Sequence, residues 1–195
     1  MIVFALSAAL LVTPAEVPCG TKQLYGRSFE LYAHNVPCEQ VAAVTAGPCG
    51  TEGHPWFCHS AAAPGPALYW RLENERYAQP TAWIEARRPS CSRSKVTRKA
   101  WDRARKRVEA DPFPTELQLL SDDLIRCKQL RGKSRRAVLK LLRGGGLGGE
   151  NYDASVSWGI GPERNLSVPD PADGEYFGVV FTRKGKVKSV GIDTI

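Results

Sequence analysis

The sequence predicts an α+β fold in two parts. We expect the C-terminal part to be a two-layer sandwich of two helices packed on a three-stranded antiparallel sheet, preceded by a small disulfide-stapled α+β unit. Three observations predict this arrangement. Five of the six cysteines precede residue 92, a basic stretch follows them, and residues 113–195 change from helical to alternating apolar periodicity.

Residues 1–15 are expected to be a secretory signal. The apolar run from Met1 to Val12 has no charge and is shorter than the roughly 20 residues that cross a bilayer. Small residues follow at Thr13 and Ala15, as at a signal cleavage site. We therefore expect a secreted or cell-envelope protein with no transmembrane helix after cleavage near Ala15. Because the run lacks a basic start, a buried strand of an intracellular protein is the alternative.

Residues 20–92 are predicted to form the small Cys-rich α+β unit. Phe29, Leu31 and Ala33 share one face of an expected strand. Residues 38–46 are expected to form a short helix, since Pro37 suits its start and Gly47 with Pro48 ends it. Further extended segments are expected at 68–72 and 83–87.

The six cysteines agree with export, because disulfides persist outside the cytosol. Six cysteines allow several connectivities, of which we favour a short Cys49–Cys58 clip and a Cys38–Cys91 bridge that closes the N-terminal unit. We expect Cys127 to be a buried free thiol, because it continues the apolar stripe of a helix. Cys19 stands where a lipoprotein would carry its lipid, although Glu16 to Pro18 are not small and apolar.

A metal site is the alternative use of these cysteines. All three histidines lie among them, which gives six possible zinc ligands within a short span: His34, Cys38, Cys49, His54, Cys58 and His59. The spacing lacks the tight Cys-x2-Cys pair of strong zinc motifs. An exported chain would oxidise these thiols, so we expect no metal and no other cofactor there.

Residues 93–112 are predicted to be a basic linker. From Arg93 to Arg107 the chain has eight cations and one acid, an excess that equals its whole net charge of +7. Clustered cations bind phosphate polymers by releasing counterions, and Trp101 is able to stack on a base. Such runs are also typical of a solvated linker and helix face. For an exported chain we favour the solvated linker, with an anionic surface as a possible partner in preference to nucleic acid.

Residues 113–195 are predicted to form the sandwich. Thr115 and Gln118 form a capping-box pattern before a helix with Leu117, Leu120 and Leu124 on one stripe. Ser134 suits the N-cap of a second helix that ends at residues 144–149. Its inward positions are expected to be Val138, Leu141 and Leu142.

Three strands are expected after these helices. Alternating apolar residues mark them: Ala154, Val156, Trp158 and Ile160, then Phe177, Val179 and Phe181, then Val190 and Ile192. Arg183 to Lys186 would join the last two strands as a hairpin, with Gly185 at a positive φ. Because two helices cover only one face of the sheet, the other face is either exposed or covered by the N-terminal unit.

The C-terminal half resembles the small envelope lipoprotein module of the SmpA/OmlA (BamE-like) family. The N-terminal half is only loosely similar to cysteine-stapled secreted bacterial domains. The matching C-terminal residues are Leu130, Gly132, Lys133, Ser134, Val138, Leu141, Leu142, Trp158 to Arg164, Tyr176, Phe177, Val179, Phe181 and Gly185 to Val187. At the turn after the second helix, Arg143 to Gly146 replaces the proline turn of the family. The resemblance implies a scaffold or protein-interaction module of the cell envelope.

No enzyme motif stands in a suitable context. Gly144-x-Gly146-x-x-Gly149 follows a helix and precedes a strand, the reverse of a dinucleotide-binding loop. Gly132-Lys133-Ser134 lacks the first glycine of a phosphate-binding loop, and no Gly-x-Ser-x-Gly occurs. We therefore expect an exported, non-enzymatic bacterial envelope protein that acts as a scaffold or protein-interaction module, with another envelope protein as its partner. The alternative is an intracellular Cys/His zinc module with a basic arm that contacts nucleic acid.

Overall fold

The computed structural model describes most of the chain after the predicted signal segment. The described residues are 16–46, 56–60, 67–72, 81–111, 114–143, 145–147, 155–164 and 174–194. Several predicted features lie outside them: the signal at 1–15, the helix stop at residues 47–48, Cys49, His54, most of the glycine loop and Ala154.

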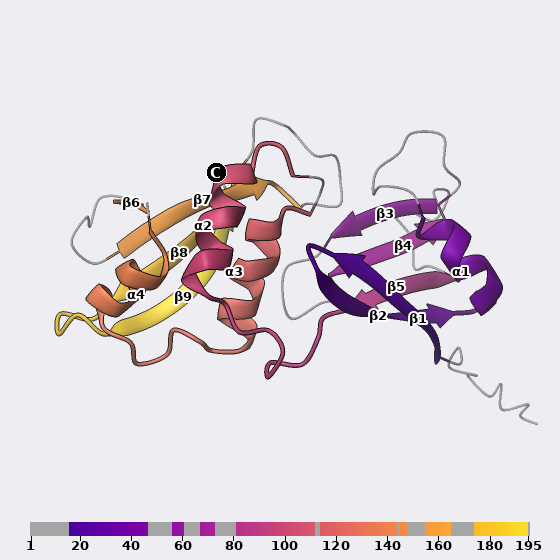
Figure 1. Cartoon of the computed structure of the whole chain (residues 1–195), viewed down its shortest axis with the longest axis horizontal. Helices are drawn as coiled ribbons and strands as arrows, with labels where there is room; N and C mark the ends of the chain where they lie inside the picture. The colour runs from indigo at the N-terminus through magenta and orange to yellow at the C-terminus, as the bar shows by residue number, and fades with distance from the viewer. Residues whose placement is uncertain are drawn as a thin grey trace, which may run out of the picture.

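The fold is α+β, as the sequence predicts, and its described strands form two antiparallel sheets (Figure 1). The N-terminal sheet has the strand order β1-β2-β5-β4-β3, and the C-terminal sheet has the order β6-β7-β8-β9. The N-terminal elements are β1 (Glu16–Leu24), β2 (Arg27–His34), α1 (Cys38–Val44), β3 (Trp56–Ser60), β4 (Leu68–Leu72) and β5 (Trp83–Arg87). The C-terminal elements are α2 (Arg98–Arg107), α3 (Glu116–Arg126), α4 (Arg135–Leu141), β6 (Gly146–Leu147), β7 (Ser155–Pro162), β8 (Gly174–Phe181) and β9 (Val187–Thr194).

The N-terminal sheet follows its predicted pattern. Phe29, Leu31 and Ala33 of β2 are buried on one face, and β4 and β5 have the predicted bounds. Helix α1 packs Val41 and Val44 into the same core. Strand β1, which the sequence did not predict, pairs with β2 through the turn between them. Its residues lack the apolar alternation that marks a half-buried strand.

The predicted basic linker contains a helix instead. Thr97 caps α2 by accepting a hydrogen bond from the Ala100 amide at 3.2 Å. Trp101 and Ala104, one turn apart, are fully buried in the C-terminal core. Trp101 contacts the rings of two core residues, Trp158 and Phe177, edge to face. A third helix therefore joins the two predicted ones on the sheet, because one apolar stripe among many cations is enough to anchor a helix.

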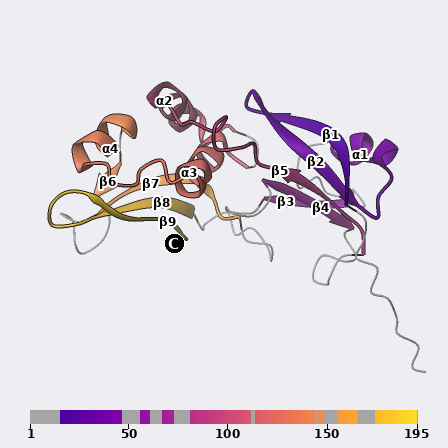
Figure 2. The ribbon, with the colours of Figure 1, turned by 90° about the horizontal axis from the view of Figure 1, so that it is seen from below.

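Helix α3 lies between the two sheets (Figures 1 and 2). The predicted capping box of Thr115 and Gln118 is present at its start. The predicted stripe of Leu117, Leu120 and Leu124 belongs to the C-terminal core, whereas Leu119 belongs to the N-terminal core. Both hydrophobic cores therefore use the same helix.

The three predicted C-terminal strands form the sheet, and the two-residue β6 extends its edge beside β7. The predicted hairpin joins β8 to β9, and Gly185 has φ 67° there. The turn of this hairpin is hydrogen-bonded to the start of α4, where the Arg135 amide donates to the Gly185 carbonyl at 2.8 Å. All three helices lie on one face of this sheet, and no described helix covers the other (Figure 2).

Candidate functional site

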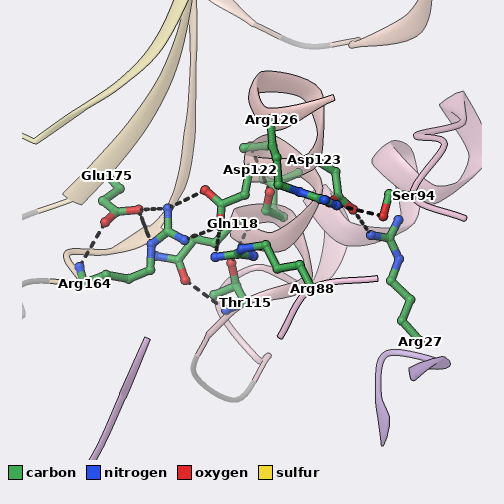
Figure 3. A network of polar contacts seen from close by, with 12 residues as sticks. Arg27, Arg88, Ser94, Thr115, Gln118, Asp122, Asp123, Arg126, Arg164 and Glu175 are labelled. Atoms are coloured by element: carbon green, nitrogen blue, oxygen red, sulfur yellow. Dashed lines mark hydrogen bonds and ion pairs between the residues drawn. The ribbon is translucent and has the colours of Figure 1, made fainter. Parts of the chain in front are cut away.

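A buried network of charged side chains joins the two units (Figure 3). At its centre is Asp122 of α3, whose side chain is fully buried. Its carboxylate accepts hydrogen bonds from Arg164 at 2.6 and 3.2 Å and pairs with Arg88 at 2.8 Å. Arg88 follows β5 of the N-terminal sheet, and Arg164 follows β7 of the C-terminal sheet. The carboxylate of Asp122 on α3 therefore binds one residue beside each sheet.

Glu175 of β8 is the second acid of this network. Its carboxylate accepts bonds from the backbone amide of Arg164 at 3.0 Å and from its Nε at 2.7 Å. Gln118, the capping residue of α3, donates to the Pro162 carbonyl at 2.6 Å and to Glu175 at 3.3 Å. The start of α3 and the ends of β7 and β8 are therefore held together by shared polar contacts.

Gly161 allows this close approach. Its φ is 141°, and a Cβ at this position would lie 2.9 Å from the Cγ2 of Thr115. The hydroxyl of Thr115 donates to the Ile160 carbonyl at 2.7 Å. A larger residue at Gly161 would push β7 away from the capping box.

Asp123, the residue after Asp122 on α3, is the third acid of the network that joins the two units. It pairs with Arg27 of β2 and with Arg126, the latter at 2.8 Å. Arg126 also donates to the Pro89 carbonyl at 2.8 Å and to the Ser94 hydroxyl at 3.0 Å. Consecutive acids of α3 thus bind arginines from both units.

The guanidinium groups of the network differ in their electrostatic environment. Burial acts to lower the pKa of Arg164, but Asp122 and Glu175 outweigh it, so that pKa is raised above its ordinary value. At Arg88 burial dominates and the pKa is lowered, although Asp122 lies against it. Because its acids are matched by arginines, the network is suited to clamping two units together.

The bare face of the C-terminal sheet is a candidate binding surface. We define it by the outward residues of β7, β8 and β9, which are mostly small: Ser155, Ser157, Gly159, Tyr176, Gly178, Val180, Ser189, Gly191 and Asp193. The Tyr176 ring lies against the backbone of Gly159 and Gly174, since a Cβ there would meet it at 3.7 and 3.4 Å. Tyr176 is half-buried, and most of the residues around it on this face have small side chains.

The outer face of the N-terminal sheet carries aromatic side chains in a row. The rings of His34 and Trp83 stack at 4.2 Å, and Tyr69 lies 6.5 Å from Trp83 on a nearly parallel plane. Arg87 covers the ring of Tyr32 at 3.9 Å. These ring faces are turned toward neighbouring side chains, so the row strengthens pairing between strands.

The structure does not assemble the alternative zinc site. Cys38 and Cys58 are disulfide-bonded and offer no thiolate, and His34 is buried against Trp83. Cys49 and His54 lie outside the described residues, as does the side chain of His59. Within the described ranges, no group of three potential metal ligands comes together.

The predicted Cys38–Cys91 bridge is wrong. Cys38 pairs with Cys19, and Cys91 pairs with Cys127, which is therefore not a free thiol. The unpredicted strand β1 brings Cys19 beside the start of α1, and the C-cap of α3 brings Cys127 beside the end of the first unit. The predicted Cys49–Cys58 bridge lies partly outside the described residues, although Cys58 is disulfide-bonded.

Comparisons of the chain with protein-family models, with characterised proteins and with solved structures found no match. The resemblance to the SmpA/OmlA (BamE-like) module stays a prediction. The buried arginine and aspartate network was not found from the sequence, because its members are far apart along the chain. Adjacent acids within an apolar helix, Asp122 and Asp123, were the one local signal of it.

Proposed function

We propose that this chain is an exported, non-enzymatic protein of a bacterial cell envelope that acts as a scaffold or protein-interaction module. The observation that carries the proposal is the pair of disulfides, Cys19–Cys38 and Cys91–Cys127. Disulfides form and persist in oxidising compartments outside the cytosol. The second bridge joins the end of the first unit to α3, so oxidation would fix the two sheets as one scaffold.

The buried network of charged side chains that joins the two units supports a role other than catalysis. Asp122, Asp123 and Glu175 are each bound to arginine, so none of these carboxylates is left unpaired in the interior. Within the described residues, no helix is long and apolar enough to cross a membrane. The bare face of the C-terminal sheet, with Tyr176 on it, is the surface that we propose for a protein partner.

Intact-mass measurement after expression of residues 1–195 in a bacterium tests export. We expect the protein in the periplasmic fraction, cleaved near Ala15, with about two mass units lost for each disulfide. A chain with Met1 intact, free thiols and stoichiometric zinc would contradict the proposal and favour the intracellular zinc module.

Photocrosslinking tests the proposed interaction surface. A benzophenone side chain at Tyr176 should form an adduct with an envelope protein, whereas the same group at the exposed Glu109 should not. Equal adducts at both positions, or none at either, would contradict a partner on the bare face.

A further inference from the structure

The surface of the C-terminal unit opposite the bare face is strongly cationic. It consists of the outward sides of α2 and α4 and of the turn between β8 and β9, and we call it the outer helical face. Its exposed cations are Lys99, Arg105, Lys106, Arg136, Lys140, Arg143, Arg183, Lys184 and Lys186.

Backbone and side-chain contacts make this face continuous. Nη1 of Arg105 on α2 donates to the Arg143 carbonyl at the end of α4 at 2.7 Å. At the other end of α4, the Val187 amide donates to the Lys133 carbonyl at 3.0 Å. In both views the turn between β8 and β9 lies beside α4, and α4 lies beside α2 (Figures 1 and 2).

Few acids neutralise these cations. Helix α4 has no acidic residue, and the one acid of α2, Asp102, pairs with Arg98 at 3.5 Å. Two further arginines of α2 pair with acids that follow the helix, in the pairs Arg103–Glu116 and Arg107–Asp111. Of the described contacts, none is an ion pair of Lys106, Arg136 or Lys140, so the positive potential of this face is largely uncompensated.

One apolar side chain stands among the cations. Leu139 is 38% exposed, and Val17 is the other large hydrophobic residue exposed in the described part of the chain. Arg136 precedes Leu139 by one helical turn on α4, and the exposed Lys140 and Arg143 follow it in the chain. The neighbouring Val138 and Leu142 are fully buried in the core, and Leu141 packs against it.

We propose that the outer helical face binds the surface of an anionic phospholipid bilayer. Cations beside such a surface are attracted to the lipid headgroups, and an apolar side chain among them is able to enter the boundary between headgroups and acyl chains. A polyanion such as nucleic acid would account for the cations but would give Leu139 nothing apolar to contact. Binding in this orientation leaves the bare sheet face pointing away from the membrane.

Cosedimentation with vesicles tests this proposal and does not depend on export. The probe is phosphatidylcholine vesicles with about one third phosphatidylserine, against vesicles of phosphatidylcholine alone. We expect binding to the anionic vesicles only, and weaker binding as salt screens the charges.

The variant R136Q/K140Q/R143Q removes three cations around Leu139. We expect its affinity for the anionic vesicles to fall about fivefold per charge, or roughly a hundredfold in all. The Arg143 carbonyl, which Arg105 binds, is retained. The matched control R93Q/K95Q/K128Q removes three exposed cations from the segments next to the Cys91–Cys127 disulfide and should bind nearly as the parent does.

Leu139→Ser separates bilayer binding from simple charge attraction. We expect a loss of a few-fold in affinity for the anionic vesicles with unchanged salt dependence and unchanged melting. Absence of binding by the parent, equal losses in the two triple variants, or an unaffected Leu139→Ser variant would each overturn the proposal. Tight binding of double-stranded DNA without vesicle binding would also overturn the proposal and would indicate a polyanion as the ligand of this face.

Discussion

Among the described residues, the core of the N-terminal sheet has one short helix of its own, α1, whereas α2, α3 and α4 cover the core face of the C-terminal sheet. The first unit has a disulfide from β1 to α1 and takes Leu119 from α3 to complete its core. The second unit has no disulfide within its described residues and packs Trp101, Trp158 and Phe177 together. A small core is thus supported by covalent bonds and a borrowed side chain, and a larger core by aromatic packing.

The largest expected effect is on the C-terminal core. Val179 of β8 is fully buried, and Val179→Asp would place an unpaired charge there, which should cost more than about 4 kcal/mol and unfold the second unit. Tryptophan fluorescence during chemical denaturation measures this.

The neighbouring residue is the matched control. Val180 lies on the bare sheet face, so Val180→Asp should change stability by less than about 1 kcal/mol. If it is as damaging as Val179→Asp, the face that we describe as bare is covered.

The second effect tests whether the units are coupled. Asp122→Ala leaves Arg88 and Arg164 without their shared carboxylate and should cost about 3 to 5 kcal/mol. Asp102→Ala, at the partly exposed pair with Arg98, should cost less than about 1 kcal/mol. Calorimetry that finds the same stability in both variants would show that the junction does not hold the units together.

The third effect should be confined to the first unit. Removing the Cys19–Cys38 bridge by serine substitution at both positions opens a loop of sequence separation 19 and should cost about 3 kcal/mol. Hydrogen exchange should speed up in β1 and α1 and stay unchanged in β8. Faster exchange in β8 would show that the C-terminal core depends on this bridge.

The smallest effect is a pH dependence. Burial, with Glu85 adding to it, raises the pKa of Tyr69 to about 12. The unfolded chain loses this proton near pH 10 while the folded chain keeps it, so stability should fall between pH 10 and about 12. Tyr69→Phe should reduce that fall in urea titrations, and an identical pH profile would contradict the role of Tyr69.

Local signals predicted most of the fold. The capping box at Thr115, the cap at Ser134 and the alternation in β7 and β8 each depend on residues a few positions apart. The disulfide partners and the arginine network depend on which distant segments meet, so neighbouring residues do not specify them. Helix α2 was missed because its charge is more conspicuous than the single stripe of Trp101 and Ala104.

The position of α3 between the sheets has a consequence for the order of folding. A chain that emerges from its N-terminus completes the five-stranded sheet at Arg87, but Leu119 and the partner of Cys91 arrive only with α3. The first unit therefore stays incomplete until the central helix of the second has been made. The second core closes later still, because β7, β8 and β9 follow α3 in the chain.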